Sequence, residues 1–351
     1  MPVYINGMGI ISPQNIEGES FLSKPIDFNS ERLAGHEPDY NKWIDIRQQR
    51  RMGRIVKMGV ATALQAMRES NVEMPDAIIT GTGLGCLEDT ASFLQKLSTT
   101  EDALNPTPFI QSTHNTIGSQ VALLLNCQNY NNTFSHRAFS FESALLDSIL
   151  LLEEKADAKI LVGSADEIIN ESHEVQKKLN LFRSALTSSL NLFSHEASGT
   201  IHGEGAVYFL LSNLKQESSY ARLIDLDTQF KPSQQELELA IQRFLNKNQI
   251  TLNEIDVVLS GKSGDQENDA ILNSFLPKLF EGKAATFKQL CGEYSTASSF
   301  ATWLAAKILR HQTIPEALSL SKNGPLRNIL IVSQYCGSYY SILLLSACRD
   351  M

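Results

Sequence analysis

The chain has 351 residues, of which 42% are hydrophobic and 20% are charged, and its formal net charge is −9. These values are typical of a globular protein long enough to bury one large core or two fused cores. The acidic balance, without any long run of lysine or arginine, argues against a nucleic-acid-binding protein.

The cysteines and the apolar segments indicate a reducing compartment. No two of the five cysteines form a C-x-x-C pair, which argues against a disulfide framework and against a zinc site, so we expect no metal. The N-terminal "MPVYINGMGI" lacks the basic and apolar regions of a signal peptide. The longest apolar runs, such as "SILLL", are too short to cross a bilayer. We therefore expect a cytoplasmic protein without membrane insertion.

Short apolar strands alternate with amphipathic helices along the chain. "PVYING" at residues 2–7 predicts a strand, and residues 50–70 carry apolar side chains at helical spacing. Further apolar runs that end in or contain glycine turns follow at residues 76–85, 157–167, 254–265 and 327–347. This alternation predicts an α/β protein with mostly parallel central sheets.

The apolar runs also repeat at about half the chain length. "DAIITGTG" begins at Asp76 and "DVVLSGKSG" begins 180 positions later at Asp256. "KILVG" at Lys159 and "NILIVS" at Asn328 are separated by a similar distance. Two pairs with nearly equal offsets suggest duplicated halves. We place the halves at residues 1–215 and 216–351, joined through the polar stretch "SNLKQESSYARL".

Residues 131–154, "NNTFSHRAFSFESALLDSILLLEE", predict a short strand that runs into a long helix. Such junctions often hold a nucleophile, because the turn exposes one side chain and the helix N-terminus favours negative charge. No cysteine stands in this stretch. Ser140 and Ser143 are present, but neither belongs to a G-x-S-x-G motif. The junction therefore has the form of a nucleophile site without an evident nucleophile.

Several segments, taken in order, resemble the signature segments of the β-ketoacyl-acyl-carrier-protein synthases. They are "YINGMGIISP", "TGTGLG", "HGEGAVYFLL" and "QYCGSYYSILLL", and they extend from the first predicted strand to the last. The most specific segment is "FSHEASGTIHGEGA", which is similar to the glycine-rich hairpin of that family. The resemblance implies a thiolase-like fold with two duplicated halves in five layers, αβαβα, working as a dimer without a cofactor.

The family's chemistry requires a cysteine at a helix N-terminus, which is acylated, and two histidines that promote decarboxylation of the malonyl unit. Matched to the family segment by segment, this chain has Ala138 at the cysteine position. Ser260 stands at the first histidine, and Glu293 stands at the second, in a stretch that keeps the family's lysine as Lys288. The resemblance therefore implies vestigial active-site positions, and we expect no catalytic residues.

Other side chains near the expected site have alternative interpretations. His136 is either a relocated base or a packed strand histidine, and Ser140 lacks an evident relay. Cys336 is either a reactive thiol or a small buried residue in place of a glycine. Glu293 beside Lys288 forms either a substrate-polarising group or a structural ion pair. The resemblance places His114 in a segment beside the dimer-facing side of the acyl pocket, and Tyr335 at an aromatic gate.

The leading hypothesis is a non-catalytic subunit that resembles a chain-length factor. Such subunits pair with an active ketosynthase and work with an acyl carrier protein in polyketide- or fatty-acid-type elongation. "PTPFIQSTHNT" and residues 131–154 resemble the small ketosynthase-like subunits of aryl-polyene-type pathways. The alternatives are a divergent β-ketoacyl synthase or acyltransferase that uses His136, Glu293 and Cys336, and a homodimeric acyl-binding or scaffold protein.

We also expect an obligate dimer, because the strand "NNTFSHRA" would leave an open edge in a monomer.

Overall fold

The computed structural model describes residues 1–14, 22–99, 105–184, 187–194, 197–322 and 324–348. Ten strands form one hydrogen-bonded sheet in the order β12-β11-β13-β14-β10-β1-β9-β6-β4-β5. The first five in the chain are β1 (Val3–Ile11), β4 (Ala77–Gly81), β5 (Tyr130–Phe134), β6 (Lys159–Asp166) and β9 (Gly205–Ser212). The other five are β10 (Ala221–Phe230), β11 (Val257–Gly261), β12 (Ala284–Thr286), β13 (Asn328–Tyr335) and β14 (Tyr339–Ser346).

The two groups of five strands have the same internal order and the same directions. β1 and β10 each pair antiparallel with the last strand of their group, β9 or β14. β6 and β13 then lead into parallel ladders with β4 and β5, and with β11 and β12. The groups meet only where Val3–Ile5 pairs with residues 221–223. The duplicated plan expected from the sequence is therefore present, although the two halves share one continuous sheet.

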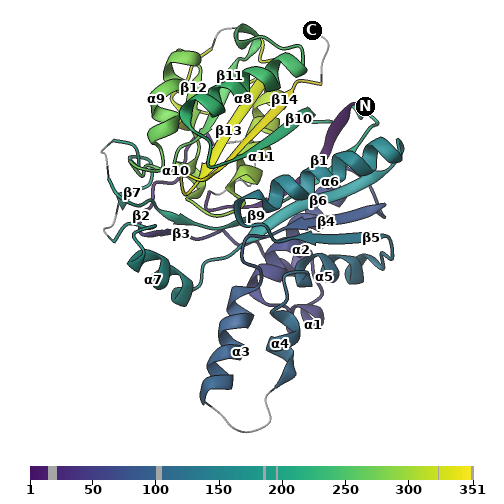
Figure 1. The fold of residues 1–351 in the computed structure, drawn as a ribbon. Coiled ribbons are helices and arrows are strands. Elements are labelled where there is room, and N and C mark those ends of the chain that lie inside the picture. Colours follow the sequence, from purple (N-terminus) through teal and green to yellow (C-terminus); the bar gives the residue numbers. More distant parts are fainter. Residues whose placement is uncertain (15–21, 100–104, 185–186, 195–196, 323, 349–351) are drawn as a thin grey trace.

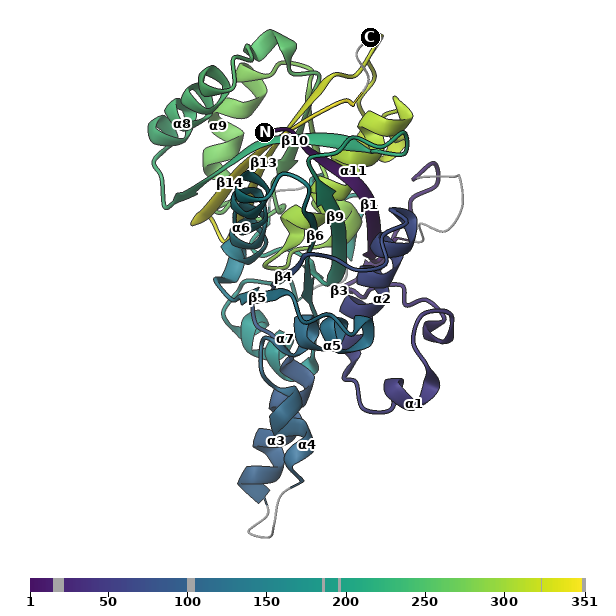
Figure 2. The same cartoon turned by 90° about the vertical axis from the view of Figure 1, so that its right-hand side faces the viewer.

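Helices form the three other layers, two outside and one between the halves (Figures 1 and 2). Helices α6 (Ser140–Glu154) and α11 (Ala297–His311) lie between the two groups of strands, in a core that both groups share. The outer face of the first group is covered by α2 (Arg54–Glu69) and α5 (Thr116–Leu125). The outer face of the second is covered by α8 (Gln234–Lys247) and α9 (Ala270–Leu279). The five-layered αβαβα fold class is confirmed.

The strand pleat explains how one strand can serve two cores. In β4, Ile79 joins the core between the halves, whereas its neighbour Ile78 joins the core under α2. Successive side chains of a strand point to opposite faces, so strands buried on both faces must be apolar throughout. This is why the sequence shows continuous apolar runs rather than alternation.

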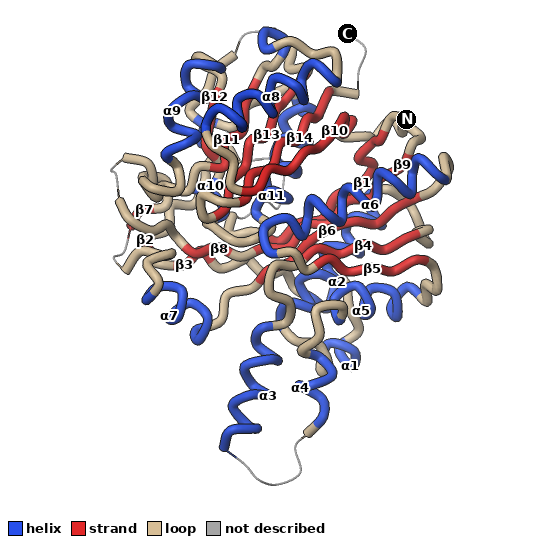
Figure 3. Tube along the Cα trace, viewed as in Figure 1, coloured by secondary structure: helices blue, strands red, loops and turns tan. Residues whose placement is uncertain are grey.

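Shorter elements connect these layers (Figure 3). The short strands are β2 (Asn29–Ser30), β3 (Arg32–Leu33), β7 (Thr187–Ser188) and β8 (His202–Gly203). The remaining α-helices are α1 (Ile46–Gln49), α3 (Leu87–Thr99), α4 (Pro106–Gln111), α7 (Asn170–Lys178) and α10 (Lys288–Cys291). The 3₁₀ turns are η1 (Tyr40–Lys42), η2 (Arg137–Phe139), η3 (Leu252–Glu254) and η4 (Glu316–Leu318). Helices α3 and α4 project from the body as an arm (Figure 1).

No helix among the described residues is both long and apolar enough to span a bilayer. The proposed boundary between residues 215 and 216 lies in the connection from β9 to β10, and the division into separate units at that point stays a prediction.

Candidate functional site

Ala138 lies at the entrance of α6, in the 3₁₀ turn η2 that links β5 to the helix. Its predecessor Arg137 has a left-handed φ of 49°, which turns the chain sharply between strand and helix. The Ser140 hydroxyl accepts a hydrogen bond from the His136 N–H at 2.8 Å and faces the carbonyl oxygens of Arg137 and Thr82 at 2.6 and 3.0 Å. Ser140 thus stabilises the turn, and its hydroxyl is not presented as a nucleophile.

A buried ion pair lies opposite this helix entrance. The Lys288 Nζ atom lies 2.8 and 2.7 Å from the two carboxylate oxygens of Glu293, and 2.5 Å from the carbonyl oxygen of Gln334. Both charged side chains are almost fully buried, at 1% and 3% exposure. Burial raises the pKa of Glu293 to about 7, although the Lys288 ammonium opposes that shift. Glu293 and the Gln334 carbonyl together accept all three hydrogens of the Lys288 ammonium. The lysine therefore has no free donor for a substrate.

The glycine-rich segment around Gly203 holds this ion pair in place. Gly203 donates its N–H to the Glu293 carbonyl at 3.0 Å, and Glu293 donates its own N–H to the Ile201 carbonyl at 2.8 Å. A Cβ atom on Gly203 would lie 2.1 Å from the Cys291 carbonyl oxygen, so only glycine permits this approach. The next residue, Glu204, is buried, and its carboxylate accepts hydrogen bonds from both terminal nitrogens of Arg54. The glycine-rich segment is therefore a structural support behind the site.

The predicted positions Ala138, Lys288, Glu293 and Tyr335 line one cavity of about 10 Å³. That volume is near the minimum that holds a single water molecule. Its walls come from η2, α6, α10, α11 and the β13–β14 hairpin, which are far apart in the sequence. The chain thus keeps the convergence of segments expected for an active site, but side chains fill the space where a substrate would stand.

Glu142 also lines this cavity, and the sequence analysis did not identify it. It lies in the first turn of α6 at 2% exposure, and its Oε2 atom has no hydrogen-bond partner among the described residues. Burial raises the pKa of Glu142 to about 7, with the Ser298 and Ser341 hydroxyls opposing the shift. The sequence signal that could have identified Glu142 was its place four residues after Ala138, because residues four apart lie on the same face of a helix.

Aromatic rings close the cavity from the side of the β13–β14 hairpin. The ring of Phe139 lies edge-on to that of Tyr339, with centroids 5.0 Å apart. Tyr339 also contacts Tyr335 and Phe230 through edge-on ring pairs. Such pairs are favourable beyond the area they bury. Tyr335 therefore belongs to a packed aromatic cluster at the position where the resemblance implies a gate.

Cys336 follows β13 in a left-handed conformation with φ 48° and is half-buried. Burial and the nearby Glu293 carboxylate raise the pKa of its thiol to about 12. Because the thiolate is the reactive form, this environment makes Cys336 a poor nucleophile. The alternative of a small residue in a glycine-like position fits the structure better than the reactive-thiol alternative.

Like Cys336, three further predicted positions lie outside the cavity. Ser260 lines a separate cavity of about 160 Å³ beneath α9, so its expected convergence with Ala138 and Glu293 is corrected. The pleat explains this, because Ser260 shares the face of Val258, whereas Leu259 faces the core between the halves. His136 is exposed and packs edge-on against Phe139 at 5.6 Å.

His114, the third of these positions, is exposed just before α5, where its ring would meet any side chain added at Gly85.

Comparisons with known proteins place this arrangement in a family. A model of the "Beta-ketoacyl synthase, N-terminal domain" matches residues 29–254. No curated protein matches the chain. Three solved structures resemble it over 99% of its length, although at low sequence identity.

The ishigamide ketosynthase/chain length factor has a TM-score of 0.80 at 18% identity, with 99% of that chain covered. A beta-ketoacyl synthase from Burkholderia phymatum STM815 has a TM-score of 0.79 at 16% identity, with 100% covered. The ketosynthase ApeO in complex with its chain length factor ApeC, from Xenorhabdus doucetiae, has a TM-score of 0.77 at 16% identity, with 98% covered. At these identities the likeness establishes the shared fold, and the family model extends over most of the chain. The chain belongs to the β-ketoacyl synthase family.

Proposed function

We propose that this chain is a non-catalytic, chain-length-factor-like subunit that pairs with an active ketosynthase in polyketide-type chain elongation. The observation that carries the proposal is the filled site at the entrance of α6. Ala138 has no group that can be acylated, and the opposite wall is the self-satisfied pair of Lys288 and Glu293. A subunit of this kind contributes surfaces and shape to a shared assembly, while its partner supplies the nucleophile.

The edge of the sheet supports pairing with a second ketosynthase-like chain. β5 is the last strand of the sheet, and it pairs only with β4. The surface around it is apolar, because Tyr130, Leu123, Leu146 and Leu150 are between 45% and 68% exposed. An open strand edge beside apolar side chains is seldom left uncovered. We propose that this surface, the β5 edge, binds the partner and buries more than about 2,000 Å² in total, the scale of permanent interfaces.

The solved structures that resemble the chain support the kind of partner by their names. Two of them name ketosynthases together with chain length factors, and another names an acyl-carrier protein in complex with its ketosynthase. Because carrier proteins are acidic as a class, a chain with net charge −9 would dock them less well than a partner with a basic face. We therefore propose that the carrier protein docks mainly on the ketosynthase partner. The aryl-polyene type of pathway is the finer assignment that the sequence segments favour.

The enzymatic alternative has less support in the geometry. It requires His136, Glu293 and Cys336 to act together, but His136 is exposed outside the cavity that Glu293 lines. The raised pKa of Cys336 and the ion pair at Glu293 leave neither an activated nucleophile nor a free base. A homodimer through the β5 edge is the remaining alternative, and it uses the same surface.

Co-expression with a cognate ketosynthase, followed by native mass spectrometry, tests the pairing. We expect a one-to-one complex, and we expect Leu146→Glu with Leu150→Glu to break it, because both side chains lie on the exposed face of α6 beside β5. Leu239→Glu is the matched control, since Leu239 is 45% exposed on α8, in the outer layer of the second half and away from β5. A ketosynthase with full activity and unchanged product length without this chain would defeat the proposal.

A further inference from the structure

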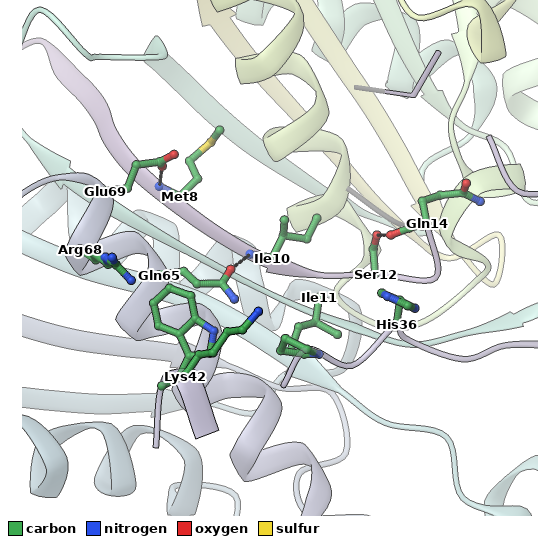
Figure 4. Close-up of a pocket in the computed structure, with 12 residues that line it drawn as sticks. Met8, Ile10, Ile11, Ser12, Gln14, His36, Lys42, Gln65, Arg68 and Glu69 are labelled. Atoms are coloured by element: carbon green, nitrogen blue, oxygen red, sulfur yellow. Dashed lines mark hydrogen bonds between the residues drawn. The ribbon is translucent and has the colours of Figure 1, made fainter. Parts of the chain in front are cut away.

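The cavity beside β1, of about 580 Å³, is bordered by polar groups that the protein itself already engages (Figure 4). The Glu69 carboxylate accepts the Met8 N–H at 2.6 Å, and the Gln65 side-chain oxygen accepts the Ile10 N–H at 3.2 Å. The side chains of Met8 and Ile10 belong to the core between the halves. Among the described residues that line this cavity, no buried side-chain nitrogen or oxygen lacks a hydrogen-bond partner. Its lining therefore does not indicate a ligand.

The smaller cavity beneath α9, of about 160 Å³, differs in this respect. Ser260 lines it at 2% exposure, and the Ser260 Oγ atom has no hydrogen-bond partner among the described residues. Thr286 stands opposite Ser260 in the parallel ladder of β11 and β12, and it lines the same cavity. The two hydroxyl groups lie at the carboxyl ends of neighbouring parallel strands, where α/β proteins commonly bind ligands. Because leaving a buried hydroxyl unpaired is costly, Ser260 indicates a missing partner in this space.

Most of the remaining wall is apolar. Leu272 and Leu276 lie one turn apart on α9, and Phe280 follows the helix. With Ala284 of β12, these side chains belong to the apolar cluster between the second half's strands and its outer helices. A Cβ atom added to Gly282 would meet nothing within 4 Å, so the cavity has an open mouth beside that residue. The cavity thus combines an apolar wall with a hydroxyl pair at one end.

The cavity offers no free charge to an ionised ligand. Lys262 is the one charged side chain among the residues that line it. Its ammonium donates a hydrogen bond to the Asn273 side chain at 3.1 Å and lies 5.8 Å from the centroid of the Phe193 ring. Neither of these partners lines the cavity. The lining therefore favours an uncharged molecule, because burying an ion without a partner is costly.

We propose that this cavity binds a phenol, an uncharged ring that carries one hydroxyl group. An apolar protein cavity of similar volume holds benzene, so a single ring fits the space. The ligand hydroxyl would accept a hydrogen bond from one of Ser260 and Thr286 and donate one to the other. A water molecule could pair with Ser260 but would leave the apolar wall without contacts. The assignment does not depend on the proposed pairing with a ketosynthase.

Titrations of the full chain followed by fluorine NMR test the site with para-fluorophenol, fluorobenzene and para-fluorobenzoate. We expect para-fluorophenol to bind, and the other two to bind at least about tenfold more weakly, because one lacks the hydroxyl and the other is ionised. Ser260→Ala and Thr286→Val should each weaken para-fluorophenol about fivefold, for the loss of one neutral hydrogen bond, and should not weaken fluorobenzene. Ser274→Ala is the matched control, since the Ser274 hydroxyl donates to the Ile271 carbonyl and does not line the cavity.

Ala284→Leu locates the ligand, because a larger side chain on the cavity face of β12 would fill the space. We expect this variant to lose para-fluorophenol binding, and thermal unfolding without ligand confirms that each variant is folded. The assignment would be overturned by no binding of para-fluorophenol, by fluorobenzene or para-fluorobenzoate binding as tightly, or by unchanged affinity in both hydroxyl variants. An affinity of Ala284→Leu equal to that of the wild type would overturn it as well, since the ligand would then lie elsewhere.

Discussion

Glu142 holds a buried carboxyl group whose Oε2 atom has no hydrogen-bond partner among the described residues. A buried carboxyl favours its neutral form, so its pKa rises from an ordinary 4.5 to about 7. The folded state then binds a proton that the unfolded chain has released between those two values. Stability from this group is present below pH 4.5 and is lost as the pH rises toward 7.

We therefore expect Glu142→Gln to flatten the fall in the free energy of unfolding between pH 5 and pH 8. The gain at the upper end should be about 3 kcal/mol at most, because the pKa rises from 4.5 to about 7 in the folded state. Glu154→Gln, at the exposed C-terminal end of the same helix, is the control. Urea unfolding at a series of pH values measures both variants. Parallel pH profiles for wild type and Glu142→Gln would contradict the expectation.

The ion pair of Lys288 and Glu293 gives a second prediction at the same scale. Lys288→Met leaves a buried carboxylate without its cation and should lower the free energy of unfolding by about 3–5 kcal/mol at pH 8. Adding Glu293→Leu removes the orphaned charge and should recover at least half of the loss. Denaturant unfolding of the two single variants and the double variant forms a closed cycle. A double variant that is no more stable than Lys288→Met would show that the charge is not the cause.

Restoring a cysteine at position 138 tests whether the missing nucleophile alone, or the whole surrounding site, prevents acylation. We expect Ala138→Cys to remain unacylated after incubation with acyl carrier protein, because its cavity of about 10 Å³ leaves no room for an acyl group. Intact-protein mass spectrometry reads the result, with the active ketosynthase in the same mixture as the positive control. An added acyl mass on Ala138→Cys would show that the surrounding groups still support catalysis.

At the scale of elements, the glycine-rich segment that joins β8 and β9 depends on one contact between backbones. Gly203→Ala would bring a Cβ atom to 2.1 Å from the Cys291 carbonyl oxygen, so β8 and α10 must move apart. We expect a loss of about 2–3 kcal/mol in the free energy of unfolding, the scale of overpacking in a core. Gly35→Ala is the control, because the atom nearest to its Cβ would be the Ile11 methyl, at 3.1 Å. Similar midpoints for the two variants in thermal unfolding would contradict this reading.

Most elements followed from patterns that depend on neighbours in sequence. Apolar runs located β4, β6, β11, β13 and β14, and helical spacing located α2, although the helix begins at Arg54, after Gly53, instead of at residue 50. The site was harder to predict. A glutamate in a first helical turn normally complements the helix dipole at the surface, so the spacing of Glu142 from Ala138 did not by itself indicate burial. Ser260 was misplaced because which face of β11 meets the site depends on tertiary packing, which the motif does not contain.

At the scale of the whole molecule, each half completes the other's core. α11 of the second half shares one core with α6 and with strands of the first half, among them β1 and β9. We therefore expect residues 1–215 expressed alone to lack a fixed tertiary structure, since that core would be open. Co-expression with residues 216–351 should restore a folded complex, measured by near-ultraviolet circular dichroism. A cooperative unfolding transition for residues 1–215 alone would contradict the expectation.

The two ends of the ten-stranded sheet are unequal, and this limits how many chains can join. β5 offers an edge of five residues, whereas β12, its counterpart in the other half, has only three. A protein with two equally adhesive edges could add further copies in a row and grow into a fibre, whereas a single adhesive edge is used up when two chains meet. Light scattering from concentrated solutions should therefore give the molar mass of a dimer and not that of a longer oligomer. The short strand β12 thus gives the assembly a natural end point.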